Sequence, residues 1–126
     1  MKALLRLLAR VRPLVSEQSF HIVLETIWRI VGDANRYVDE QAPWALRRSD
    51  PARMGTVLYT LAETLRHLAI LVQPFVPGAA RKLLDQLAVP QAARDFATLA
   101  ETPLAPGTRL PKPEAIFPRF VEEAAG

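Results

Sequence analysis

Side chains between positions 35 and 53 could bind a single-stranded nucleic acid. Trp44 follows Pro43, and the flat ring of a tryptophan at a helix end could stack on an unpaired base. Arginines beside such a ring could hold phosphates. The candidate residues are Asn35, Arg36, Pro43, Trp44, Arg47, Arg48 and Arg53. One aromatic platform with positive charge around it predicts an RNA-binding site.

Each candidate also has a structural explanation. Trp44 could close the end of a helical bundle. Asn35 is more simply explained as satisfying the backbone of the following loop, and Arg36 could pair with Asp39 or Glu40. The three later arginines could form a solvated surface run. For the arginines, the residues alone leave both explanations open.

Other site chemistry is not readable in the chain. His21 and His67 have no second histidine or cysteine at ligand spacing, so we expect no metal site. No glycine-rich phosphate loop, Ser-His-Asp set or pair of carboxylates is present. We therefore expect no cofactor and no catalytic activity from this chain alone.

Composition limits the class of protein. The chain has 126 residues, half of them apolar, which fits one domain with a compact core. A net charge of +3 permits an RNA partner without requiring one. The lack of cysteine suits the reducing cytosol, and we expect a cytoplasmic protein. Arginines interrupt the first apolar run, which favours a basic amphipathic helix over a signal or transit peptide, and no run could span a membrane.

Four helices are expected to position the candidate residues. In the first, Leu4, Leu8 and Val11 share one face and Lys2, Arg6 and Arg10 another, and Pro13 ends or kinks it. Ser16 is the expected N-cap of the second, with Glu17 in its first turn. The second helix has an apolar stripe and ends at Pro43, with Trp28 expected in the core. That stripe is Phe20, Leu24, Ile27, Val31, Ala34 and Val38.

Asp50-Pro51 predicts the start of a third helix, with Asp50 as N-cap. Its expected core stripe is Met54, Leu58, Leu61, Leu65, Leu68 and Val72. Pro77 can open a fourth helix that ends before Pro90. Its expected inward residues are Ala80, Leu83, Leu84 and Leu87.

The chain changes character after Pro90. A short helical turn is expected at 95–99, and repeated prolines from Thr102 onward forbid a regular helix. Ile116, Phe117 and Phe120 are expected to anchor this segment on the body. The sequence thus predicts an all-α antiparallel bundle of about four helices in residues 1–90, with an extended Pro-rich arm in residues 91–126.

Several stretches resemble one family. They are NRYVDEQAPW at 35–44, LAILVQPFVP at 68–77 and LPKPEAIFPRF at 110–120. In this order and spacing they are similar to the C-terminal anticodon-binding domain of bacterial-type methionyl-tRNA synthetases. The family's first helix of this domain, which reads the anticodon with an asparagine and an arginine, has no counterpart here. The chain therefore resembles an N-terminally truncated piece of such an enzyme.

The resemblance implies a function. Trp44, supported by Pro43, would stack on an anticodon base of tRNA(Met), and the parent enzyme would charge that tRNA with methionine using ATP. ATP, and usually zinc, would belong to a separate catalytic domain, which would be the partner of this chain. Neither DNA nor a membrane is an expected partner. The alternative is a helical protein-interaction module with no RNA role.

Overall fold

The computed structural model describes residues 2–121 of this chain. All regular secondary structure in that part is helical. Side chains are described from residue 6 to residue 121. The elements are α1 (Lys2–Ser16), α2 (Phe20–Gln41), α3 (Pro43–Ser49), α4 (Pro51–Val72), α5 (Pro77–Gln86), the 3-10 turn η1 (Gln91–Ala93) and α6 (Thr98–Glu101). The all-α prediction is confirmed. No described helix is long and apolar enough to cross a membrane.

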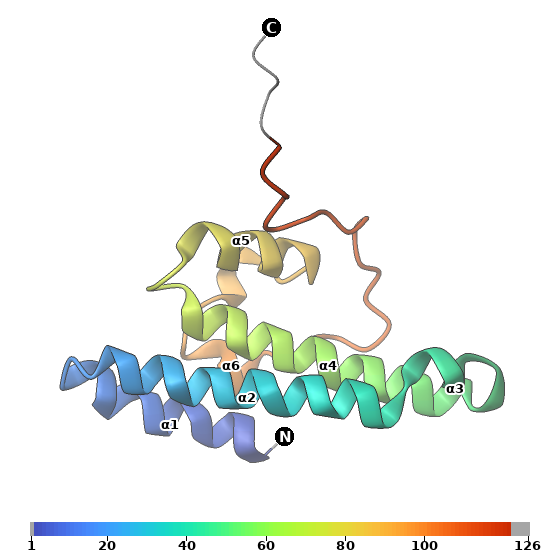
Figure 1. Ribbon diagram of the computed structural model, residues 1–126, viewed down its shortest axis with the longest axis horizontal. Helices are drawn as coiled ribbons and strands as arrows, with labels where there is room; N and C mark the ends of the chain where they lie inside the picture. The colour runs from blue at the N-terminus through green and yellow to red at the C-terminus, as the bar shows by residue number, and fades with distance from the viewer. Residues whose placement is uncertain (1, 122–126) are drawn as a thin grey trace, which may run out of the picture.

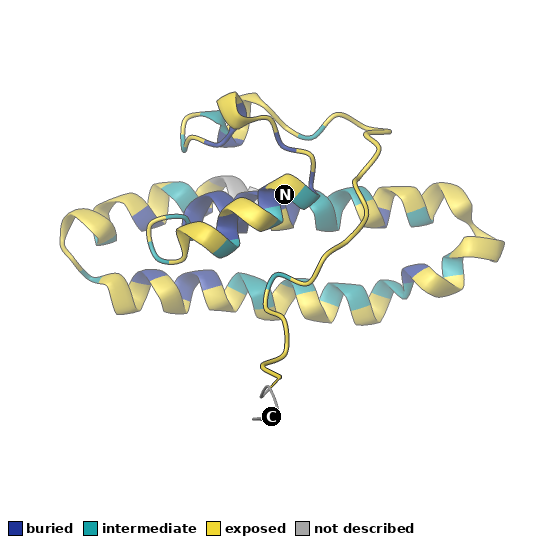
Figure 2. Ribbon diagram, turned by 90° about the horizontal axis from the view of Figure 1, so that it is seen from above, coloured by how far each residue is buried: buried dark blue, intermediate teal, exposed yellow. Residues whose placement is uncertain are grey.

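Two helices of 22 residues each, α2 and α4, form the frame of the molecule. They run antiparallel, with α1 packed on α2 and α5 packed on α4 (Figure 1). The short helix α3 joins them at one end, far from α1 and α5. Seen from above, that end of the pair extends beyond the rest of the bundle (Figure 2).

The hydrophobic core lies at the opposite end of the pair. It combines α1, the first half of α2, the last third of α4, α5 and the segment that follows. Its buried members are Leu7, Val11, Val23, Ile27, Leu68, Ala69, Ile70, Leu71, Leu84, Leu87, Val89, Ala93 and Leu99. Burying each large aliphatic side chain stabilises the fold by about 1.5–3 kcal/mol. The end that carries α3 is therefore held mainly by contacts among α2, α3 and α4.

Two predicted helix starts are confirmed. The carboxylate of Asp50 accepts a hydrogen bond of 3.0 Å from the backbone N–H of Arg53, and Pro51 is the first residue of α4. Pro77 likewise begins α5. Both arrangements satisfy or remove backbone donors that a helix leaves unpaired at its start.

The predicted start of the second helix is wrong. Ser16 is the last residue of α1, which continues past Pro13, and its hydroxyl donates to the carbonyl of Arg12. The break comes at Gln18, whose φ of 57° lies in the left-handed region. Helix α2 begins after Ser19, so Glu17 lies in the connection. Leu4 and Lys2 have side chains outside the described residues; Val11 is buried and Leu8 half-buried, as expected.

The predicted core stripe of α4 is wrong at two of its six positions, while Met54, Leu61 and Val72 are half-buried. Leu58 and Leu65 are exposed, whereas Leu68 is buried as expected. Trp28 of α2 was also expected in the core but is 69% exposed and lines an open apolar groove with Leu24 and Phe117. An apolar stripe is buried only where another element packs closely on it, and these positions lie outside the core cluster. The inward residues of α5 are confirmed: Ala80, Leu84 and Leu87 are buried and Leu83 is half-buried.

The Pro-rich arm is extended from Thr102 onward. A helical turn is present at Thr98–Glu101, slightly later than predicted, and Ala93 and Leu99 before it belong to the core. Phe117 and Phe120 do not act as anchors in this structure, since they are 79% and 90% exposed; Ile116 is half-buried. Polar contacts hold the arm instead. The division of the chain at residue 90 stays a prediction.

Two sets of hydrogen bonds attach the arm to the bundle. On α4, the hydroxyl of Tyr59 donates to the carbonyl of Leu104 over 2.8 Å, and the N–H of Leu104 donates to the carboxylate of Glu63 over 2.6 Å. On α5, the amide of Gln86 donates to the carbonyl of Glu114 over 2.6 Å. The arm therefore bridges α4 and α5 through its backbone.

Candidate nucleic-acid interface

The candidate site is built on the corner where α2 passes into α3. Ala42 alone separates the two helices. Its N–H donates to the carbonyl of Val38, which ends α2, and its carbonyl accepts from the N–H of Ala45, which begins α3. To do both, Ala42 adopts φ 40° and ψ 62°, a left-handed conformation that costs about 1–3 kcal/mol for a residue other than glycine.

Pro43 and Trp44 follow at the first turn of α3. Pro43 is buried and fixes the backbone angle of the first helical residue. Trp44 is 65% exposed, and the helix that carries it, α3, lies at the outer end of the molecule (Figure 1). Trp44 therefore does not close the bundle as a core residue, and its ring is accessible for stacking.

Arg47 and Arg48 lie three and four residues after Trp44 in the last turn of α3. This spacing places both guanidinium groups on the face of the helix that carries the tryptophan. Both side chains are exposed, and neither takes part in an ion pair among residues 6–121. The corner thus combines an aromatic face with two positive charges that remain available to an anion.

Asn35 and Arg36 lie one to two turns before the corner, both exposed on α2. Helix α2 continues to Gln41, so Asn35 has no following loop to satisfy, and that explanation is wrong. Arg36 pairs with Asp33 at 3.5 Å, not with Asp39 or Glu40. Because both partners of this pair are exposed, the pair is worth less than about 1 kcal/mol and Arg36 can exchange it for another anion.

Arg53 differs from the other arginines of the site. It lies in the first turn of α4, and its guanidinium donates a hydrogen bond to the side-chain carbonyl of Gln41, the last residue of α2. This hydrogen bond therefore joins the two ends of the segment 41–53, which contains α3.

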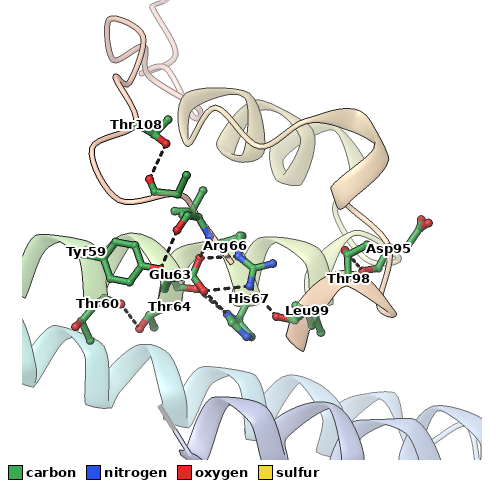
Figure 3. A network of polar contacts seen from close by, with 12 residues as sticks. Tyr59, Thr60, Glu63, Thr64, Arg66, His67, Asp95, Thr98, Leu99 and Thr108 are labelled. Atoms are coloured by element: carbon green, nitrogen blue, oxygen red, sulfur yellow. Dashed lines mark hydrogen bonds and ion pairs between the residues drawn. The ribbon is translucent and has the colours of Figure 1, made fainter. Parts of the chain in front are cut away.

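A buried polar cluster on α4 was missed by the sequence analysis (Figure 3). Arg66 donates to both carboxylate oxygens of Glu63, over 2.8 and 3.1 Å, and to the carbonyl of Leu99 over 2.7 Å. His67 Nδ1 lies 2.8 Å from the carbonyl of Glu63. Glu63, Arg66 and His67 are all buried. Their spacing of three and four residues was the available signal, but such pairs usually lie on a solvated helix face.

The cluster shifts two pKa values. Burial alone would raise the pKa of Glu63, but hydrogen bonds from Arg66 and Leu104 together with the positive charge of Arg66 lower it below its usual value of 4.5. Burial and the nearby Arg66 lower the pKa of His67 below 6.5, although the Glu63 carbonyl opposes this change. The cluster holds a carboxylate and a neutral histidine at neutral pH. It belongs to the core and not to the corner.

Similarity to known proteins points to one family. Residues 15–125 match a family model described as the anticodon binding domain of methionyl tRNA ligase. A methionine–tRNA ligase of Brucella suis is 55% identical over 111 residues, which is 88% of this chain and 22% of that protein. One of Mesorhizobium japonicum is 51% identical over 117 residues, covering 92% of this chain and 23% of the relative.

Solved structures agree with this match. The apo form of Mycobacterium tuberculosis methionyl-tRNA synthetase superposes with a TM-score of 0.90 at 41% identity, over 97% of this chain and 25% of that one. The same enzyme bound by methionyl-adenylate gives a TM-score of 0.89 at 42% identity, over 93% and 24%. The chain thus spans about a quarter of the length of the proteins that it matches.

Proposed function

The chain belongs to the family of anticodon-binding domains of methionyl-tRNA ligases, and from this premise we propose that its corner binds the anticodon loop of tRNA(Met). The observation that carries the proposal is the exposed Trp44 on the same helix face as two arginines that form no ion pair within residues 6–121. An unpaired base would stack on that ring, as bases do on aromatic platforms in single-stranded nucleic-acid sites.

The remaining candidate residues take distinct roles in this proposal. Arg47 and Arg48 hold phosphates on either side of the stacked base. Asn35 and Arg36, exposed on the adjoining turns of α2, reach base edges or the backbone. Pro43, buried at the first helical position of α3, fixes the backbone that carries Trp44. Within a complete cytoplasmic synthetase, this contact would select the tRNA that a separate catalytic part charges with methionine, using ATP.

A titration with two anticodon stem-loops tests the proposal. The chain should bind a stem-loop with a CAU anticodon more tightly than one with a changed anticodon. Trp44→Ala should weaken binding to the CAU stem-loop by about 1–3 kcal/mol, the usual contribution of one base–aromatic stack. It should barely change the melting temperature, because an exposed ring buries little area on folding.

Two outcomes would contradict this assignment. Equal affinity for both stem-loops would argue against anticodon reading. A collapsed melting temperature of Trp44→Ala with unchanged RNA affinity would place Trp44 among the structural residues. Arg48→Ala should also weaken binding through the loss of one positive charge, and Arg29→Ala, at an exposed position of α2 outside the corner, is its control.

The open apolar groove supports a second proposed contact. Trp28, Leu24 and Phe117 line it and are exposed, which is unfavourable for a free surface. We propose that this groove meets the catalytic part of the same synthetase. Trp28→Ser should then weaken association with a separately produced catalytic domain while leaving stem-loop binding unchanged. Unaltered association of the Trp28→Ser variant would contradict this proposed contact.

A further inference from the structure

We propose that Arg53 and Gln41 act as positioning residues that hold the Trp44 platform in place, and that Arg53 is not a phosphate ligand. This inference rests on the proposed role of Trp44 in RNA binding and deepens it. It starts from the hydrogen bond between the Arg53 guanidinium and the Gln41 side chain, which joins the end of α2 to the start of α4.

Helix α3 packs on α4, but Pro43 is its only buried residue, so a polar tie across the corner can add to the order of α3. The hydrophobic core is at the other end of the α2–α4 pair, and most side chains of α3 are exposed. Helix α3 has only seven residues, too few to be stable by itself. Its orientation therefore depends on its packing against α4 and on how its two ends are held.

Both ends of α3 are already constrained by single residues. At the start, Ala42 holds a strained left-handed conformation that sets the angle between α2 and α3. At the end, Asp50 caps α4 by accepting from the N–H of Arg53. The side chain of Arg53 then reaches back to Gln41, beside Ala42, and closes the loop. Arg53 thus connects the cap of α4, through its backbone N–H, with the end of α2, through its side chain.

This arrangement predicts how the two residues behave. The hydrogen bond to Gln41 uses one N–H of the Arg53 guanidinium and directs this side chain along the α2–α4 pair, whereas Arg47 and Arg48 have no side-chain hydrogen bond among residues 6–121. If the tie opens, α3 gains freedom and the Trp44 ring no longer keeps one orientation. RNA affinity then falls, because the binding of RNA must order the Trp44 ring again. Gln41 is neutral, so its removal disturbs the position without removing a charge.

The experiment compares Gln41→Ala, Arg53→Ala and the double variant in the 126-residue chain carrying Trp28→Phe, which leaves Trp44 as the single tryptophan. Time-resolved fluorescence anisotropy without RNA should show faster and wider motion of the Trp44 ring in all three variants. Affinity for the CAU stem-loop should fall about threefold to tenfold in each single variant, the equivalent of one hydrogen bond, and no further in the double variant. The dependence of binding on salt should stay unchanged, whereas Arg48→Ala should reduce its slope.

Gln86→Ala, which removes a glutamine hydrogen bond on α5, is the matched control and should leave the Trp44 anisotropy and RNA affinity unchanged. The proposal is overturned if Gln41→Ala has no effect and Arg53→Ala reduces the salt slope, because Arg53 would then contact phosphate. It is also overturned if the anisotropy of Trp44 does not change in the three variants. If Trp44→Ala leaves RNA affinity unaltered, the RNA-binding role of Trp44 fails, while the anisotropy still decides whether Arg53 positions the ring.

Discussion

His67 makes the stability of this chain depend on pH, since it is buried in the neutral form. Its pKa is lowered in the folded state, so the unfolded chain takes up the proton first as the pH falls. The contribution of His67 to the free energy of unfolding is fully present above pH 6.5. It decreases as the pH falls from there through the pKa that His67 has in the folded chain. Glu63 acts in the same direction at lower pH, below 4.5, because its folded pKa is lowered too.

The corresponding experiment is a series of thermal melts between pH 7 and pH 5. The melting temperature of the parent chain should fall steadily over this range. His67→Asn keeps a donor for the Glu63 carbonyl but cannot titrate, so its melting temperature should change less with pH. His21→Asn, at an exposed position, controls for the loss of a histidine. A parent chain with a flat profile would mean that His67 is not buried in solution.

At the scale of elements, helices α4 and α5 show which residues carry the fold. Leu84 of α5 is completely buried, whereas Leu65 of α4 is exposed although it lies on a regular apolar stripe. Leu84→Ala should lower the free energy of unfolding by about 2–5 kcal/mol, through lost burial and a residual cavity. Leu65→Ala, the same chemical change, should cost much less. Urea denaturation of both variants measures the difference, and equal costs would mean that another element covers Leu65.

The sequence predicted the helices better than it predicted their buried faces. Local signals such as Asp50-Pro51 and Pro77 act on their own helix, so they could be read without knowing its neighbours. An apolar stripe shows which residues share a face but not which element packs there. Trp28 and Leu65 were assigned to the core for that reason. The buried Glu63–Arg66 pair could not be foreseen, because its partners at Leu99 and Leu104 are more than 30 residues away.

The corner was predicted more completely, because its residues are contiguous. Pro43, Trp44 and the arginines of α3 lie within one turn or two of each other, so chain order alone brings them together. The contribution of Arg53 to that corner depends on its side-chain direction across the α2–α4 pair, which no sequence pattern specifies.

At the scale of the whole molecule, we expect a recognition part without catalytic activity of its own. The sequence contains no phosphate loop or catalytic set, and no group of three or more metal-binding side chains is found among the described residues. The purified chain should therefore show no methionine-dependent exchange between ATP and pyrophosphate. A complete methionyl-tRNA synthetase is the positive control. Measurable exchange by the chain alone would contradict this expectation.

The extended arm also determines how the molecule responds to a protease. Between its attachments at Leu104 and Glu114 the backbone is exposed, and Arg109 offers trypsin a peptide bond that is not in a helix. The bond after Lys112 precedes Pro113 and should resist cleavage. Brief digestion should therefore cut after Arg109 and also after Arg119, which is exposed and outside any helix. The single exposed hydrogen bond from Gln86 to Glu114 is worth about 1 kcal/mol, too little to hold a free peptide, so the released C-terminal piece should dissociate and native mass spectrometry should find the body without it.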